Sequence, residues 1–217
     1  MSYVPSAFRV EDPDRIRELL DAHPLAVLVT FGGGRLHVSH LPLQFVPEPA
    51  GHGKLIGHFA RANPQAQHHD PSIEALAVFS GPGAYVSPSG YPTKRETGKV
   101  VPTWNYAAVY AYGQLRFLDE HETTHDVVSR LTDSHESKRE NPWAVSDAPA
   151  DYVDTLLGAI RAFEFCITRI EGKWKMSQNR PGADRQGVMD ELARGGGGEQ
   201  AVLAEMTRLF HGRPEET

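Results

Sequence analysis

The 217-residue chain is long enough to bury one sizeable hydrophobic core, and its content of 40% hydrophobic and 23% charged residues is ordinary for a globular protein. Acidic residues outnumber basic ones by 28 to 22, which gives a formal net charge of −6. This balance argues against autonomous binding to DNA, because lysine and arginine side chains that neutralise phosphates supply most non-specific affinity for DNA. No apolar run approaches the roughly 20 residues that span a bilayer, and the first residues lack the basic-then-apolar order of an export signal. We therefore expect no membrane association and a cytoplasmic location.

The first elements expected along the chain are a helix and a β-hairpin. Apolar residues recur at helical spacing after an N-cap at Asp12, which predicts a helix over residues 13–22. The stretches PLAVLVTF and RLHVSHLPLQFV, separated by Gly32, Gly33 and Gly34, predict two strands joined by a tight turn. Two more strands are expected at GKLIGHFA and IEALAVFSGP, with an Asn-Pro turn or a short helix between them.

Longer strands and helices are expected in the second half of the chain. Residues 84–98 are rich in Pro, Gly, Ser and Lys, which predicts a long exposed loop. β-branched and aromatic residues fill positions 100–119, which predicts one long strand or a bent pair of strands. Helices are expected over residues 123–135 and in DYVDTLLGAI. The last strand is expected in AFEFCITRIEGKWKM, where Cys166, the single cysteine, is predicted to be a small buried core residue.

The order of these elements predicts the fold class. Six or so strands without regular strand-helix alternation favour a mainly β fold with peripheral α-helices, arranged as an antiparallel β-barrel. Two helices are expected at about 184–194 and 199–210, with a flexible break at the four glycines 195–198. We expect a single barrel domain over 1–217, with a helical C-terminal extension at about 182–217.

Two histidine-rich stretches raise the question of a metal site. HETTH contains His121, Glu122 and His125 at the spacing with which zinc peptidases hold a metal-bound water. Its apolar stripe begins only at Val127, however, so the pattern is expected on a solvated first turn of a helix. The adjacent pair His68 and His69 is interpreted as part of a surface turn, because adjacent side chains seldom converge on one ion. We therefore predict no metal site.

The stretch GHFARANPQ offers a candidate anion site. It places Arg61 and Asn63 at a strand end directly before Pro64, a residue common in the first turn of a helix. A guanidinium beside a helix N-terminus is suited to binding a phosphate. The alternative is a polar strand end in which Asn63 is an ordinary N-cap.

Two other segments combine ring-binding and hydrogen-bonding groups. In VVPTWNY, Trp104 supplies a flat surface beside Thr103 and Asn105, a combination that a heteroaromatic ligand such as a flavin requires. KWKMSQNR offers cationic and amide donors to an anion or a ring edge. The alternatives are core aromatic residues in the first segment and a solvated strand end in the second. The residues of KWKMSQNR that offer these groups are Lys173, Lys175, Ser177, Gln178 and Asn179.

Five motifs in order between residues 3 and 180, namely YVPSAF, GHFARANP, GPGAYVSPS, VVPTWNY and KMSQNR, carry a resemblance to the PaiB family. This family comprises FMN-binding negative transcriptional regulators linked to sporulation and protease genes. The resemblance implies an FMN-binding split β-barrel, a homodimer and a flavin mononucleotide cleft at the subunit interface.

The resemblance also implies roles for residues of this chain. It places flavin contacts on the strand that contains His37, and at the HFARAN strand end, where Arg61 and Asn63 become phosphate binders. The family usually reads SPSWY where this chain has Gly90 in SPSGY, which predicts a more open cleft. The implied cofactor-binding residues are Val38, Ser39, His40, His58, Arg61 and Asn63, together with Thr103, Trp104, Asn105, Lys175, Ser177 and Gln178 for the ring and ribityl chain, contributed by the same or the second subunit.

Several functions stay open at this point. The first is a transcriptional regulator of PaiB type, for which a partner protein is expected to assist because the net charge of −6 does not favour direct binding to DNA. The second is a flavin-dependent oxidoreductase that uses the same cleft, with His40 or His58 as the acid-base candidate. The third is haem binding, with one of these histidines as axial ligand.

Overall fold

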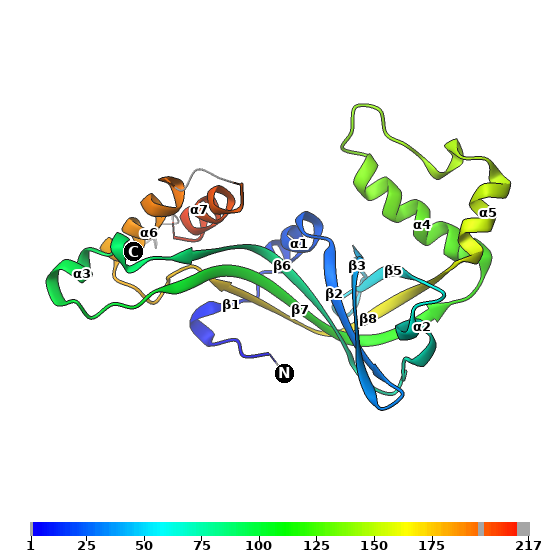
Figure 1. Ribbon diagram of the computed structural model, residues 1–217, viewed down its shortest axis with the longest axis horizontal. Helices are drawn as coiled ribbons and strands as arrows, with labels where there is room; N and C mark the ends of the chain where they lie inside the picture. The colour runs from blue at the N-terminus through cyan, green and yellow to red at the C-terminus, as the bar shows by residue number, and fades with distance from the viewer. Residues whose placement is uncertain (1, 195–197, 212–217) are drawn as a thin grey trace. The chain divides into compact units, whose positions relative to one another are not determined.

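The computed structural model describes residues 2–194 and 198–211, and Figure 1 labels its helices and strands. The chain forms two compact units. The first unit contains the described residues of Met1–Ile16, Ser80–Val109 and Glu171–Thr217, and the second contains Arg17–Phe79 and Tyr110–Ile170. Three long strands pass from one unit into the other: β6 (Ala75–Val86), β7 (Thr103–Leu118) and β8 (Ile160–Lys175).

The sheet is mainly antiparallel, as predicted. The five shorter strands are β1 (Arg9–Val10), β2 (Leu25–Gly32), β3 (Arg35–Pro42), β4 (Gln44–Val46) and β5 (Lys54–Ala60), so eight strands replace the six or so expected. Hydrogen bonding gives the order β3-β2-β6-β7-β8-β5-β4, with β1 paired to β8. Within the described residues no ladder joins β3 to β4, so the sheet is open between its two end strands. This is the arrangement of a split barrel.

The prediction of the first helix is confirmed, and so is the turn of the hairpin, but the second predicted strand of the hairpin is divided into β3 and β4. Helix α1 (Pro13–Ala22) begins after Asp12, whose Oδ1 accepts a hydrogen bond of 3.0 Å from the backbone N–H of Asp14. Strands β2 and β3 pair antiparallel over their full length, from Leu25 opposite Pro42 to Gly32 opposite Arg35. The turn between them uses positive φ angles of 56° at Gly33 and 76° at Gly34, a conformation that glycine adopts without steric cost.

The core of the second unit lies on both sides of β5 and β8, which pair from Lys54 opposite Cys166 to Ala60 opposite Ile160. On one side, Phe59 and Phe163 are fully buried with ring centroids 4.9 Å apart. On the other side, helix α4 (His121–Glu136) packs onto the sheet and is followed by η3 (Val145–Asp147) and α5 (Ala150–Gly158). The residues of this second cluster are Ile56, Ala162, Val127 and Leu131.

A close backbone approach joins β2 to the short helix α2 (Pro64–His68). A Cβ atom at Gly32 would lie 1.5 Å from the carbonyl oxygen of His68, so only glycine fits at this position. Gln65 of α2 makes a second contact with β2. Its side chain is buried, and its Nε2 donates a hydrogen bond of 3.0 Å to the carbonyl of Leu28.

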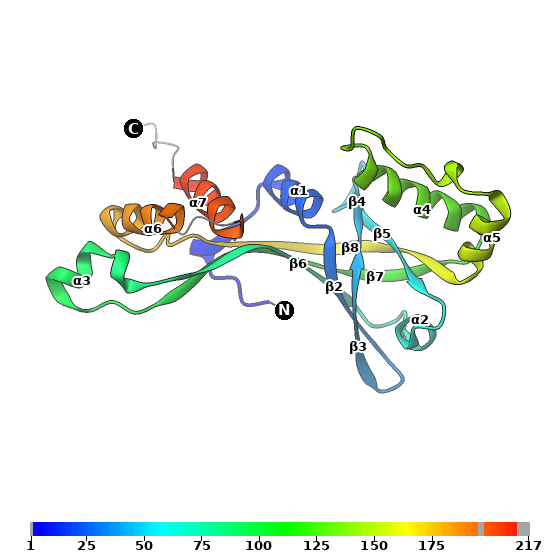
Figure 2. The ribbon, with the colours of Figure 1, turned by 45° about the horizontal axis from the view of Figure 1, so that its top comes forward.

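In the first unit, the two C-terminal helices lie side by side on one face of the strands (Figures 1 and 2). They are α6 (Gly182–Arg194) and α7 (Gly198–His211), close to the bounds expected from the sequence. Residues 195–197 of the predicted glycine break lie outside the described residues. The remaining elements are η1 (Ser6–Phe8), β1, η2 (Pro88–Gly90) and α3 (Pro92–Thr97).

The prediction of a long exposed loop over residues 84–98 is wrong. Strand β6 continues to Val86, and η2 and α3 follow it. The segment is ordered by contacts with α6: Tyr91 is buried, and Asp184 accepts a hydrogen bond of 3.1 Å from the backbone N–H of Thr93. These partners are about 90 residues away in the sequence, so local composition could not reveal them.

The prediction that Cys166 is buried is also wrong. Cys166 is exposed, because it shares a face of β8 with Ala162 but lies outside the cluster in which α4 buries Ala162. None of the helices in the described part of the chain combines the length and apolar composition needed to cross a bilayer.

Candidate functional site

Arg61 lies at the carboxyl end of β5, where its backbone and part of its side chain are held in place. Its backbone N–H donates to the carbonyl of Ala159 at 2.8 Å, and its Nε donates to the carbonyl of Gly158 at 3.2 Å. Among residues 2–194 and 198–211, the terminal Nη groups of Arg61 make no hydrogen bond or ion pair. An exposed guanidinium that is anchored through Nε and keeps a free terminal fork is suited to binding a phosphate.

Asn63 connects this strand end to β3. Its Oδ1 accepts from the backbone N–H of Gln65 at 2.9 Å, which makes Asn63 the N-cap of α2. Its Nδ2 donates to Oγ of Ser39 at 3.0 Å. Both ends of the Asn63 amide are therefore engaged, and the Ser39 hydroxyl keeps its own proton for donation to a ligand.

The other predicted residues of β3 lie apart from this contact. Val38 and His40 are exposed and share one face of the strand with Leu36. His37 lies on the opposite face, where its Nε2 is 3.1 Å from the carbonyl oxygen of Gly32. Of the residues predicted to bind flavin from β3, Ser39 is therefore the one that contacts Asn63.

A second arginine, at the start of β8, is already neutralised. Arg161 forms a bidentate pair with Asp119 at 2.7 and 2.8 Å, and its guanidinium lies 3.8 Å from the ring centroid of Phe117. The hydrogen bonds from Arg161 hold the pKa of Asp119 below its ordinary value. Sequence reasoning missed this pair. Of the two arginines described at the paired ends of β5 and β8, Arg61 is therefore the one whose terminal donors are free.

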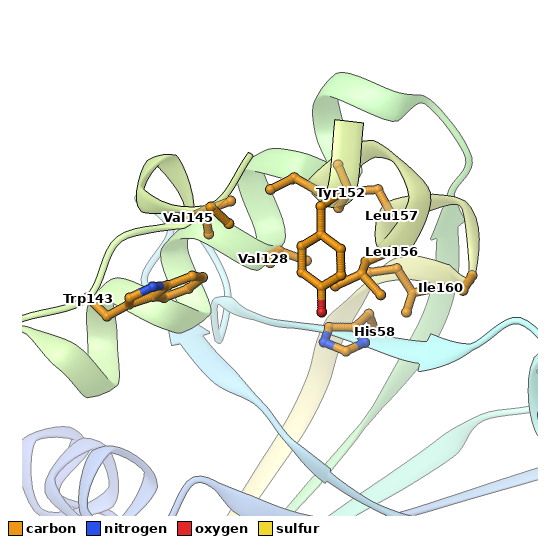
Figure 3. A pocket seen from close by; sticks show the side chains of 11 residues that line it. His58, Val128, Trp143, Val145, Tyr152, Leu156, Leu157 and Ile160 are labelled. Atoms are coloured by element: carbon orange, nitrogen blue, oxygen red, sulfur yellow. The ribbon is translucent and has the colours of Figure 1, made fainter. Parts of the chain in front are cut away.

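His58 lines an apolar pocket of about 310 Å³ that lies within the second unit (Figure 3). Burial lowers the pKa of His58 below its ordinary value of 6.5, and its Nδ1 is buried without a hydrogen-bond partner in the described chain. The sequence analysis did not predict this pocket. The signal that could have indicated it is the set of apolar side chains that the amphipathic helix α5 leaves exposed. The lining residues are His58, Val128, Trp143, Val145, Ala148, Tyr152, Val153, Leu156, Leu157, Ala159 and Ile160.

In the first unit, two lysines lie on β8 close to aromatic and hydroxyl groups. Lys175 donates a short hydrogen bond from Nζ to Oγ1 of Thr103, and burial is the main cause that lowers the pKa of Lys175. Lys173, which lies in the predicted KWKMSQNR segment, is buried and donates to the carbonyl of Tyr3 at 2.9 Å. Its Nζ also lies 5.3 Å from the ring centroid of Tyr106. This arrangement concentrates positive charge beside an aromatic surface.

The KMSQ turn after β8 is held by its own side chains. Asn105 and Ser177 exchange two hydrogen bonds of 3.0 and 3.1 Å in a buried position. Gln178 accepts from the backbone N–H of Met176 at 2.7 Å and donates to the carbonyl of Trp174. Asn105, Ser177 and Gln178 therefore shape the turn, and their polar atoms are largely satisfied within the protein.

Trp104 is exposed and forms an edge-to-face pair with Tyr85, their ring centroids 6.3 Å apart. Tyr85 lies on β6 and was not identified from the sequence. The pair presents exposed aromatic surface on which a planar ring can stack.

Gly90 does not open a cleft at its own position. A Cβ atom there would lie 2.4 Å from Oε2 of Glu191, and one at Gly187 would lie 2.0 Å from the carbonyl oxygen of Gly90. The two glycines allow η2 and α6 to pack closely. The expectation of a looser structure at SPSGY is therefore wrong at this position.

The HETTH motif lies at the start of α4 with both histidines exposed, as the solvated-turn interpretation predicts. His121 pairs with Asp154 of α5 at 3.2 Å, and Nδ1 of His125 lies 3.4 Å from Oγ of Ser129. The described residues contain no group of three side chains placed to hold a metal ion.

The twelve predicted cofactor-binding residues divide equally between the two units. The structure joins Ser39 with Asn63 in the second unit, and Thr103 with Lys175 in the first. The second unit contains Val38, Ser39, His40, His58, Arg61 and Asn63, and the first contains Thr103, Trp104, Asn105, Lys175, Ser177 and Gln178.

Comparison with solved structures identifies the fold. The chain is similar to a conserved hypothetical protein of Mycobacterium tuberculosis, with a TM-score of 0.58 and 11% identity over 83% of this chain and 94% of the other. It is also similar to the FAD and heme binding protein of Mycobacterium smegmatis, with a TM-score of 0.54 and 15% identity over 88% of this chain and 80% of the other. At these identities the likeness shows the fold alone, an antiparallel split barrel.

Sequence comparison identifies the family. The chain is 32% identical over 190 residues to the Bacillus subtilis protein named "Protease synthase and sporulation protein PAI 2", a match that covers 88% of each chain. Residues 2–169 match the family model described as "Putative FMN-binding domain". The chain therefore belongs to this FMN-binding family, with PaiB of Bacillus subtilis as a relative, a split-barrel fold and FMN as the family's cofactor.

Proposed function

We propose that this chain is a cytoplasmic, homodimeric FMN-binding regulator of PaiB type. The observation that carries the FMN part is Arg61, whose exposed guanidinium is anchored through Nε while its terminal donors stay free. Ser39, positioned by Asn63, offers a hydroxyl donor from the neighbouring segment. In this proposal Arg61 and Ser39 bind the phosphate, and Asn63 orients Ser39.

The group in the first unit is proposed separately as the contacts of the ring and ribityl chain. Trp104 and Tyr85 offer stacking surface, and Lys175 offers a cationic donor near Thr103. When bound, FMN supplies electron transfer, while the protein binds, orients and tunes it. Asn105, Ser177 and Gln178 support this group by shaping the turn that follows Lys175.

The homodimer is supported by the exposed aliphatic face of β3. Leu36 and Val38 are both largely exposed on a strand at the end of the sheet order. Exposed apolar side chains on an end strand favour association with another chain. In this proposal the flavin cleft lies at such a subunit interface, as the resemblance to the PaiB family implies.

The regulatory role is supported by the name of the Bacillus subtilis relative, which refers to protease synthesis and sporulation. The net charge of −6 favours regulation through a partner protein over direct repression of DNA. An electrophoretic mobility shift with the protein's own promoter region at physiological salt tests this point. Binding by the purified protein alone would contradict the electrostatic argument.

The test of the cofactor is an absorption titration of the purified protein with FMN and with riboflavin. We expect saturable FMN binding that is tighter than riboflavin binding, because riboflavin lacks the phosphate. A colourless protein that ignores added FMN would sink the proposal.

A flavin-dependent oxidoreductase is the second candidate. The solved relative from Mycobacterium smegmatis binds FAD and heme according to its name, and this supports redox chemistry on the same fold. Turnover of reduced nicotinamide by the FMN-loaded protein would favour this candidate, and tight FMN binding without turnover would favour a sensor. A Soret band after reconstitution with haem would favour the haem alternative, with His40 or His58 as axial ligand.

A further inference from the structure

The apolar pocket beside His58 is a cavity that the proposed FMN contacts do not line. It lies entirely in the second unit, where β5 contributes His58 and helices α4 and α5 contribute apolar side chains (Figure 3). Its volume of about 310 Å³ lies at the lower end of the range of small-molecule sites. A compact ligand of one or two rings suits this size.

The polarity of the lining restricts the ligand further. Only His58, Trp143 and Tyr152 contribute side-chain nitrogen or oxygen atoms, and no lining residue is an acid, a lysine or an arginine. A charged ligand would lose its hydration without gaining an opposite charge. Trp143 and Tyr152 are 47% and 56% exposed, so they offer ring surfaces on the open side of the pocket.

His58 provides the one buried polar atom that lacks a partner here. Its Nδ1 is buried and makes no hydrogen bond within the described residues. In Figure 3 the hydroxyl end of Tyr152 points toward the imidazole from the opposite wall. An unpaired buried nitrogen is unfavourable, so a ligand that completes its hydrogen bond gains affinity. The lowered pKa of His58 supports a neutral ring near neutral pH.

The walls of the pocket are formed without a ligand. Val127 and Leu131 anchor α4 on the sheet through the cluster that includes Ile56. His121 and Asp154 connect α4 to α5 at 3.2 Å. A preformed site needs little reorganisation on binding, which favours affinity.

We propose that this pocket binds an uncharged aromatic molecule of one or two rings that carries a single hydroxyl or carbonyl group and forms a hydrogen bond with His58. The rings occupy the apolar space between α4 and α5. The polar substituent points to the floor of the pocket, where His58 donates or accepts according to its tautomer.

Calorimetric titration of the full chain with 1-naphthol, naphthalene and 1-naphthoate tests the proposal. We expect 1-naphthol to bind roughly ten-fold more tightly than naphthalene, because it adds one hydrogen bond. The anion 1-naphthoate should bind most weakly. Affinity should be the same with and without added FMN, since none of the residues proposed to bind FMN lines the pocket.

Two variants locate the binding. His58→Leu should lower the affinity for 1-naphthol roughly ten-fold and leave that for naphthalene nearly unchanged. Leu156→Trp should fill the pocket and abolish binding of both. Val202→Trp on α7 is the matched control, because Leu156 and Val202 are both 49% exposed, and it should bind as the wild type does. Circular dichroism verifies that each variant is folded.

Several outcomes would overturn the proposal. One is equal affinity for 1-naphthol and naphthalene, or no binding of either up to about 1 mM. Another is unchanged binding in folded Leu156→Trp, or displacement of 1-naphthol by FMN. A dimer that dissociates on Leu156→Trp would instead make the pocket a contact between subunits, and a Soret band lost in His58→Leu would make it a haem site.

Discussion

Asn105 and Ser177 exchange two hydrogen bonds of 3.0 and 3.1 Å across a buried contact, and Ser177 holds a positive φ of 63° there. It is the single non-glycine residue of the described chain with a positive φ. Such strained positions persist where the surrounding contacts over-determine them, and they gather at functional sites.

The first prediction concerns this contact. Ser177→Ala should lower the free energy of unfolding by about 1–3 kcal/mol, because the buried Asn105 amide loses its partner. Ser177→Gly should destabilise the protein by about 1 kcal/mol less than Ser177→Ala does, because glycine adopts the left-handed conformation without strain. Urea unfolding measures both variants. Equal destabilisation by alanine and glycine would show that the backbone at Ser177 is not strained.

The second prediction separates the phosphate of FMN from the rest of the flavin. Arg61→Ala should weaken FMN binding by roughly 10–100-fold, the loss of a charged hydrogen-bonded pair, and leave riboflavin binding unchanged. Arg17→Ala removes an exposed arginine of α1 and serves as control. Fluorescence titration of the flavin gives all affinities. If both flavins weaken equally, Arg61 acts on the ring or on the fold and not on the phosphate.

The third prediction tests the dimer surface on β3. Val38→Glu places a charge on the exposed aliphatic face beside Leu36 and should yield monomers at concentrations where the wild type is a dimer. Val202→Glu on α7 is the control and should stay dimeric. Sedimentation velocity distinguishes the two species. If Val38→Glu remains a dimer, the subunit interface does not include this face of β3.

The fourth prediction concerns the pH dependence of the Glu164 ion pairs. Burial raises the pKa of Glu164, but hydrogen bonds from Lys54 and Arg116 outweigh it, so the folded pKa lies below its ordinary value of 4.5. The ion pairs therefore stabilise the protein above about pH 4.5, and this contribution is lost as the pH falls through the lower folded pKa. Glu164→Gln should cost about 1–2 kcal/mol at neutral pH, since Arg116 is largely exposed.

The difference between wild type and Glu164→Gln should shrink as the pH falls below about 4.5. Chemical unfolding at several pH values measures it. A difference that stays constant down to strongly acidic pH would show that the ionised form of Glu164 contributes nothing to stability.

The fifth prediction concerns acid sensitivity through His58. Its folded pKa is lowered by burial, so below about pH 6.5 the unfolded chain binds a proton more readily than the folded chain. The wild type should therefore lose more stability between about pH 7.5 and about pH 5 than His58→Leu does. His58→Gln, which also cannot be protonated, should follow the leucine variant. A wild-type slope equal to both variants would contradict the burial of His58.

Local patterns were sufficient for much of the fold. The hairpin of β2 and β3 was predictable because Gly33 and Gly34 mark a turn between two apolar runs. Strand β7 was predictable because β-branched and aromatic residues fill it, and helices α6 and α7 because their apolar residues recur at helical spacing. In each case the signal lies within the element itself.

Predictions failed where distant contacts decide the structure. The segment after β6 is a 3-10 turn and a helix because α6 packs onto it, with Asp184 accepting from the backbone of Thr93. Leu43 interrupts the predicted second strand of the hairpin, since its backbone N–H donates to the carbonyl of Pro24 while its side chain is buried. For the candidate site, motifs identified Arg61 and Lys175, but the pairing of Arg161 with Asp119 depends on two strands far apart in the sequence.

The three tryptophans of the chain lie in three different surroundings, so they can serve as intrinsic fluorescence probes of three different regions. Trp174 is buried beside the KMSQ turn, Trp143 is half exposed at the pocket, and Trp104 is exposed beside Tyr85. Variants that retain one indole at a time would therefore emit at different wavelengths. The emission of Trp174 would report unfolding of the first unit, and that of Trp143 would report ligand binding in the pocket beside His58. The emission of Trp104 would report quenching by an added flavin.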